Sequence, residues 1–165
     1  GERCCHEHAQ FVGELPLDAA GVLRQRADAL RAIDGDEPRA GEPYWTIDPI
    51  DGTTNFVNGL PVWCVVLAGV SGGQTQIGVI HDPVHDETFV ATRGGGAYLN
   101  GAPIRVAEGT PLHSGTVSVG YSNRVEAMNV VPVVTALIER GAMFHRNASG
   151  ALSLAYVAGG RLLGY

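Results

Sequence analysis

Short apolar runs, each closed by turn-forming residues, dominate the chain after Tyr44. Ser-Gly-Gly-Gln, His-Asp-Pro and Gly-Gly-Gly segments separate them, and the chain holds 23 glycines and 9 prolines. Runs of this kind predict strands joined by tight turns. The strands are expected at residues 62–70, 76–80, 88–91 and 116–119, with a further strand-like segment after the three glycines.

Helical spacing of apolar residues appears in three other segments. These segments are residues 18–33, 124–140 and 149–162, and Pro132 is expected to kink or bound the second of them. Residues 35–43 carry charges and turn formers and are expected to form a surface loop. Strands followed by helices predict an α+β fold, with helices covering a face of a sheet. We expect residues 1–165 to form a single domain.

Composition excludes several classes of function. The chain has 11 Lys and Arg against 17 Asp and Glu, a net charge of −6, and no basic cluster, so we expect no nucleic-acid partner. The longest apolar run, residues 62–70, is less than half of the about 20 residues that a bilayer-spanning helix needs, so no membrane segment is predicted. Three cysteines without a framework spacing indicate a reducing, cytoplasmic setting.

Residues 45–56 contain the pattern that carries chemistry. Asp48 and Asp51 follow an apolar stretch, Pro49 stiffens the backbone between them, and Gly52 permits a sharp turn directly afterwards. Two carboxylates directed to one point repel each other unless a cation lies between them, and Mg²⁺ prefers such oxygen ligands. The segment therefore predicts a metal site.

Glycine and small hydroxyl residues follow the two aspartates. Gly52, Thr53 and Thr54 enter a short helix-like segment, where backbone N–H groups are free to hold an anion. Carboxylates for Mg²⁺ beside amides for phosphate are typical of phosphoryl-transfer sites. The alternative is that each Asp merely begins a turn, which explains the residues singly but not their combination.

The Asp-Pro-Ile-Asp-Gly-Thr motif at residues 48–53 resembles the signature of the inositol monophosphatase family. The resemblance continues through residues 54–61, 77–83, 94–101 and 149–163, so that it covers the chain from Tyr44 onward. It implies a Mg²⁺-dependent, lithium-sensitive phosphomonoesterase with a layered αβαβα sandwich. It also implies that this chain holds an incomplete sandwich, and that the protein is a homodimer.

The resemblance also implies a role for each motif residue. Asp48 would bridge two Mg²⁺ ions, Asp51 would hold the second, and the carbonyl oxygen of Ile50 would hold the first. The amides of Gly52 and Thr53 would cradle the phosphate. Chemistry would then proceed by a metal-activated water and not by a covalent enzyme intermediate.

An upstream glutamate is expected to complete this arrangement. The family places it in a Gly-Glu motif, which makes Glu14 the first candidate, with Glu37 and Glu42 as rivals. Together with the Thr53 hydroxyl, it would orient the attacking water and ligate the metal.

Two further parts of the family pattern bear on the substrate and the second metal. Ser149 and Gly150 align with residues that touch the hydroxyl-bearing ring of the substrate, but the family has Gly, Ser or Thr, and then Ala where this chain has Ala148, Ser149 and Gly150. The family's third aspartate, in a Trp-Asp motif, would follow the segment that matches residues 160–165.

We therefore predict Mg²⁺-dependent hydrolysis of a small polyol or cyclitol phosphate monoester. One alternative is the same chemistry on histidinol phosphate, a sugar phosphate or an aminocyclitol phosphate. Another is a catalytically weak or inactive domain that binds metal and phosphate. Two other groupings of metal-binding residue types are interpreted as a chance terminal cluster and a hairpin turn, namely residues 4–8 and 81–86.

Overall fold

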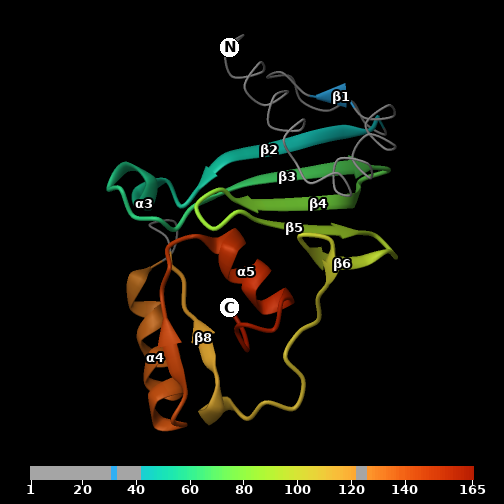
Figure 1. The fold of residues 1–165 in the computed structure, drawn as a ribbon. Coiled ribbons are helices and arrows are strands. Elements are labelled where there is room, and N and C mark those ends of the chain that lie inside the picture. Colours follow the sequence, from blue (N-terminus) through green and yellow to red (C-terminus); the bar gives the residue numbers. More distant parts are fainter. Residues whose placement is uncertain (1–30, 33–41, 122–125) are drawn as a thin grey trace. The chain divides into compact units, whose positions relative to one another are not determined.

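The computed structural model describes residues 31–32, 42–121 and 126–165 (Figure 1). These residues divide into two compact units. The first comprises the described residues up to Pro49 together with Val65–Pro103, and the second comprises Ile50–Cys64 and the described part of Ile104–Tyr165. The predicted helix at residues 18–33 lies outside the described residues except at its end.

That end is a correction to the sequence prediction. Arg31–Ala32 forms strand β1, which pairs in parallel with Tyr44 and Trp45 of the next strand. Pairing with β2 thus overrides the local helical spacing at these two residues.

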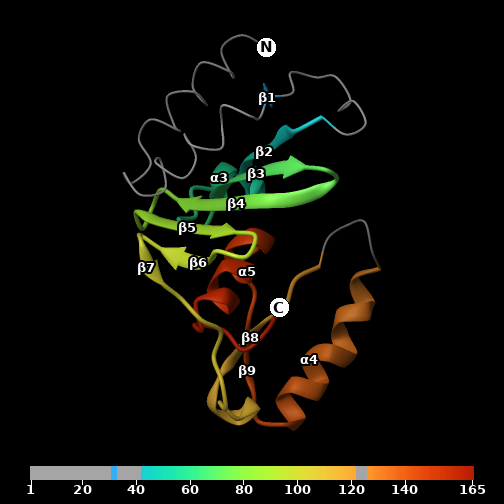
Figure 2. The same ribbon diagram turned by 90° about the vertical axis from the view of Figure 1, so that its right-hand side faces the viewer.

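Strands β1 to β7 form one sheet in which spatial order follows chain order. From β3 to β7 each strand pairs with the next in antiparallel fashion, as the successive strands in Figure 2 show. The predictions for residues 62–70, 76–80 and 88–91 are confirmed by β3, β4 and β5. After β1 the strands are β2 (Tyr44–Asp51), β3 (Cys64–Ser71), β4 (Gln74–Asp82), β5 (Glu87–Thr92), β6 (Gly96–Leu99) and β7 (Ala102–Pro103).

Alternation of side chains explains the core of the first unit. Leu67 on β3 lies opposite Val79 on β4, and Ile77 lies two residues before Val79 on the same face. All three are buried, and Trp45 and Val90 pack against them. The core thus arises from the period-two pattern that predicted these strands.

The second unit combines short helices with a small parallel sheet. Strand β8 (Thr116–Ser118) pairs with β9 (Met143–His145), and Val119, Leu137 and Ala142 form its core. The predicted strand at residues 116–119 and the two later helices are confirmed. The helices are α3 (Thr53–Val57), α4 (Val130–Glu139) and α5 (Gly150–Ala158), with single 3-10 turns at Leu112–Ser114 and Ala127–Asn129.

Pro132 lies in the first turn of α4, and the helix continues through it to Glu139. The missing N–H of proline is harmless at this position, because first-turn N–H groups have no partner within the helix. None of the described helices combines the length and apolar character that crossing a bilayer requires.

Candidate functional site

Gly52 turns the chain directly after the second motif aspartate. Asp51 ends β2, Gly52 has a φ of 93°, and Thr53 begins α3. A Cβ atom on Gly52 would lie 3.0 Å from the carbonyl oxygen of Val62 and 3.3 Å from the Cα of Trp63. Both the left-handed backbone and the close packing therefore require glycine here.

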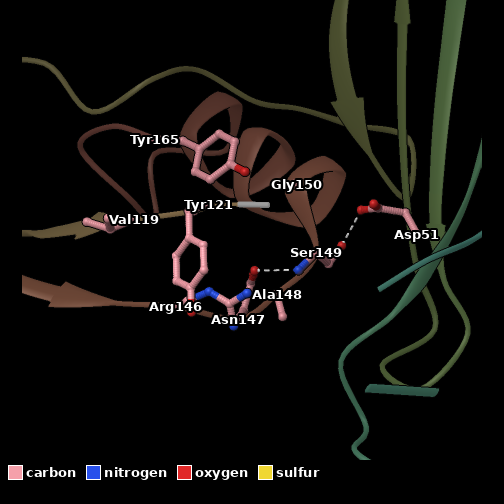
Figure 3. A pocket seen from close by; sticks show the side chains of 10 residues that line it. Asp51, Val119, Tyr121, Arg146, Asn147, Ala148, Ser149, Gly150 and Tyr165 are labelled. Carbon is pink, nitrogen blue, oxygen red and sulfur yellow. Dashed lines mark hydrogen bonds between the residues drawn. The ribbon is translucent and has the colours of Figure 1, made fainter. Parts of the chain in front are cut away.

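The Asp51 carboxylate is held at the start of α5. Its Oδ2 accepts hydrogen bonds from the Ser149 hydroxyl at 2.5 Å and from the backbone N–H of Ala151 at 2.8 Å, the first of which is drawn in Figure 3. The Cys64 thiol lies 3.9 Å from the same oxygen. Oδ1 accepts no hydrogen bond from the described residues, which leaves it available to another ligand.

The first turn of α5 is built to receive that carboxylate. Ser149 is the N-cap residue, and its hydroxyl oxygen accepts the N–H of Leu152 at 3.2 Å. Ala151 uses its own N–H on Asp51. The negative charge thus lies at the positive end of the helix dipole, where it is stabilised. Ala148, just before the cap, has a φ of 61°, a left-handed conformation that alanine disfavours.

Two asparagines hold the segments around the cap. The Asn147 Oδ1 accepts the Ser149 N–H at 3.0 Å and the Ser153 hydroxyl at 2.9 Å. The buried Asn55 side chain on α3 donates to the carbonyl oxygens of Val62 and Asn147, at 2.7 and 2.6 Å. The second of these bonds joins α3 to the segment between β9 and α5.

Thr53 and Ile50, both predicted site residues, are bonded to each other. The Thr53 hydroxyl donates to the carbonyl oxygen of Ile50 at 2.8 Å, and Thr53 is exposed. This bond joins the first residue of α3 to the end of β2 within the motif turn.

A pocket of about 450 Å³ lies beside this arrangement (Figure 3). It carries opposite charges in its lining, since Asp51 and Arg146 both border it. The Arg146 guanidinium stacks over the Tyr121 ring, 4.8 Å from the ring centre, and has no carboxylate within salt-bridge distance among the described residues. The remaining lining residues are Val119, Gly120, Asn147, Ala148, Ser149, Gly150 and Tyr165.

Other predicted site residues lie elsewhere. Asp48 is an exposed residue of β2 and belongs to the first unit, whereas Asp51 belongs to the second. Glu42 is exposed just before β2. Glu14 and Glu37 lie outside the described residues. Within the described part of the chain no three His, Cys, Asp or Glu side chains are grouped as a metal site.

A divalent cation nevertheless fits the donors that are described. Asp51 offers an oxygen without a hydrogen bond from the described residues, and Ile50 offers a carbonyl oxygen from the same turn. Oxygen-only donors of this kind suit Mg²⁺ or Ca²⁺ and not a thiolate-seeking metal.

Sequence reasoning missed the bond between Asp51 and Ser149. It predicts Ser149 as a contact for substrate; in the structure Ser149 is 1% exposed, lines the pocket, and donates its hydroxyl to Asp51. Cys64 is buried, and its thiol contacts both residues. The turn interpretation of residues 81–86 is confirmed, because buried Asp82 accepts the N–H groups of Val84 and His85 between β4 and β5.

Comparison with known proteins identifies the family. The described residues form a mixed sheet with helices, and the sequence model of the inositol monophosphatase family matches residues 11–165. The chain therefore belongs to the inositol monophosphatase family. The predicted α+β fold of the inositol monophosphatase type is confirmed.

Two bacterial proteins are among the relatives of known sequence. The chain is 41% identical over 146 residues to the Nus factor SuhB of Escherichia coli K12, covering 87% of this chain and 52% of that protein. It is 42% identical over 123 residues to the Nus factor SuhB of Xylella fastidiosa, covering 73% and 45%. The chain thus spans about half the length of the curated relatives that it matches.

Solved structures give the same fold. The extragenic suppressor protein suhB of Bartonella henselae matches with a TM-score of 0.73 and 28% identity, covering 93% of this chain and 60% of that one. The IMPase of Thermotoga maritima matches with a TM-score of 0.69 and 34% identity, covering 87% and 56%.

Proposed function

We propose that this protein is a Mg²⁺-dependent phosphatase that hydrolyses a phosphate monoester of a small polyol or cyclitol. The observation that carries the proposal is the placement of Asp51. In a member of the inositol monophosphatase family, this motif aspartate borders a pocket, has one oxygen held by α5, and keeps the other oxygen open. Such a carboxylate is suited to hold a hard cation beside a substrate.

The family motif suggests how the remaining residues act. Glu14, Asp48, Asp51 and the Ile50 carbonyl would hold Mg²⁺, which when bound supplies an activated water for attack on phosphorus. The amides of Gly52 and Thr53 would bind the phosphate oxygens. The Thr53 hydroxyl and Glu14 would orient the attacking water, and Glu14 would accept its proton.

Hydrogen-bond donors in the lining of the pocket support a leaving group that carries several hydroxyls. Gly150 lines the pocket at the start of α5, and its N–H group, which has no hydrogen-bond partner among the described residues, would donate to a substrate hydroxyl. Arg146 and Tyr121 add a donor and an aromatic face.

Release of inorganic phosphate tests the proposal. We expect turnover of inositol monophosphate or another ester in a panel that includes histidinol phosphate, a sugar phosphate and an aminocyclitol phosphate. Activity should require Mg²⁺, vanish with EDTA and fall with lithium. Asp48→Asn and Asp51→Asn should each abolish activity, whereas Asp86→Asn, in the exposed β4–β5 turn, should leave it unchanged. Full activity in Asp51→Asn would overturn the proposal.

A domain that binds metal and phosphate without efficient turnover is the second candidate. The comparison that favours it is the name Nus factor that the bacterial relatives carry. In that case Mg²⁺ would still raise the melting temperature by binding the folded state, while phosphate release stayed at background. Size-exclusion chromatography with light scattering would test the expected homodimer in the same preparation.

A further inference from the structure

Ser149 is placed to control the geometry of Asp51. We propose that Ser149 is a positioning residue, whose hydroxyl holds Asp51 Oδ2 and thereby directs Oδ1 toward a bound Mg²⁺. The inference rests on the proposed function for its metal, and it gives Ser149 a different role from the substrate contact that the sequence suggests.

The hydroxyl of Ser149 has no proton left for a substrate. A serine hydroxyl has one donor hydrogen, and here that hydrogen is given to Asp51 at 2.5 Å. One lone pair accepts the Leu152 N–H, and the Cys64 thiol lies 3.7 Å from the oxygen. Ser149 is also buried, with 1% of its surface exposed.

Two hydrogen-bond donors at the N-terminus of α5 hold the Asp51 carboxylate in place. The Ser149 hydroxyl and the Ala151 N–H both reach Oδ2, and hydrogen bonds to an ionised group are short and strong. Rotation of the Asp51 side chain would break both bonds. Oδ1 is therefore held in one direction, which reduces the reorganisation that cation binding needs.

Capping α5 does not by itself account for this arrangement. A cap needs only an acceptor for the Leu152 N–H, whereas the bond to Asp51 uses the hydroxyl hydrogen. The two roles can therefore be separated by experiment.

Two measurements on the full chain test the inference. One is the affinity for Mg²⁺, measured by calorimetry, and the other is the Mg²⁺ concentration that gives half-maximal activity. Ser149→Ala should weaken Mg²⁺ binding by about 10- to 100-fold, as for other partners of metal ligands, and Ser149→Thr, which keeps the hydroxyl, should stay near wild type. Ser153→Ala is the matched control, because it removes another buried hydroxyl of α5 that does not contact Asp51. Unchanged Mg²⁺ binding in a folded Ser149→Ala variant would overturn the inference.

A double-mutant cycle without metal separates this inference from the proposed function. Unfolding of Ser149→Ala, Asp51→Asn and the double variant should show strong coupling if the hydroxyl holds the carboxylate, and additive effects would overturn that contact. If the wild-type chain bound no Mg²⁺ at all, the proposed function would fail, and the cycle alone would then decide whether Ser149 positions Asp51.

Discussion

Both the backbone conformation and the close packing at Gly52 exclude a larger residue from this position of the motif. Its φ of 93° brings Thr53 and α3 directly after Asp51, and a Cβ would press on the Val62 carbonyl oxygen. Gly52→Ala should therefore lower the free energy of unfolding by about 2 kcal/mol or more and impair activity. Gly59→Ala is the matched control, because Gly59 has a φ of 70° but open space around it. Urea denaturation measures both variants, and equal losses would contradict the steric part of the argument.

Ala148 presents the opposite case, a non-glycine residue where the backbone favours glycine. With its φ of 61°, Ala148→Gly should relieve strain and raise the free energy of unfolding by about 1 kcal/mol. For a chain of this size that corresponds to about 2–4 °C in melting temperature. Ala158→Gly, in the last turn of α5, should have the reverse effect. A lower melting temperature for Ala148→Gly would show that the left-handed turn carries no strain.

Helix α4 is stabilised through one of its faces. Leu137 is 9% exposed and packs in the core of the second unit, whereas the adjacent Ile138 is 60% exposed. Leu137→Ala should cost about 2–4 kcal/mol of unfolding free energy, because it removes a buried side chain and leaves a cavity. Ile138→Ala should stay within about 0.5 kcal/mol. Similar losses in urea denaturation of the two variants would contradict the assigned buried face.

The β4–β5 hairpin carries a histidine whose titration links stability to pH. Burial lowers the pKa of His81 below its ordinary value, against the opposing effect of the Asp86 and Asp82 carboxylates. His85, bonded to Asp82, is the other histidine of this turn. Below about pH 6.5 the unfolded chain binds a proton at His81 more readily than the folded chain does. Protonation of His81 therefore lowers the free energy of unfolding as the pH falls. The melting temperature should therefore drop less between about pH 7.5 and 5.5 in His81→Gln than in wild type. An identical drop would exclude a contribution from His81.

Elements with a local signal could be predicted, and those that depend on distant pairing could not. Residues 76–80 and 88–91 carry their own alternation and turn residues, and they became β4 and β5. Strand β9 (Met143–His145) is three residues long, and its formation depends on parallel pairing with β8. These three residues carry no strand pattern of their own. The same reason explains why Arg31 and Ala32, within a helical spacing, form β1.

At the scale of the whole molecule, the motif could be found from the sequence. The contacts from other segments that hold the motif residues in place could not. Residues 48–53 lie together in the chain, so their types and spacing were enough to indicate metal and phosphate. Asp51 and Ser149 are 98 positions apart, and only folding brings them together. Neither the Arg146 and Tyr121 pair nor the link between Asn55 and Asn147 leaves a local signal, because each joins separate segments.

The upstream glutamate that acts with the motif is a prediction about the longest separation along the chain. Its three candidates lie at different distances before residues 48–53. Glu42 is exposed next to β2, six positions before Asp48, whereas Glu14 is the one in a Gly-Glu motif. If Glu14 orients the attacking water, Glu14→Gln should lower kcat by about 10²- to 10⁴-fold, because the amide cannot accept a proton. Glu42→Gln and Glu37→Gln should retain activity near wild type. A loss confined to either of these two variants, measured by phosphate release at saturating Mg²⁺, would transfer the role to that residue.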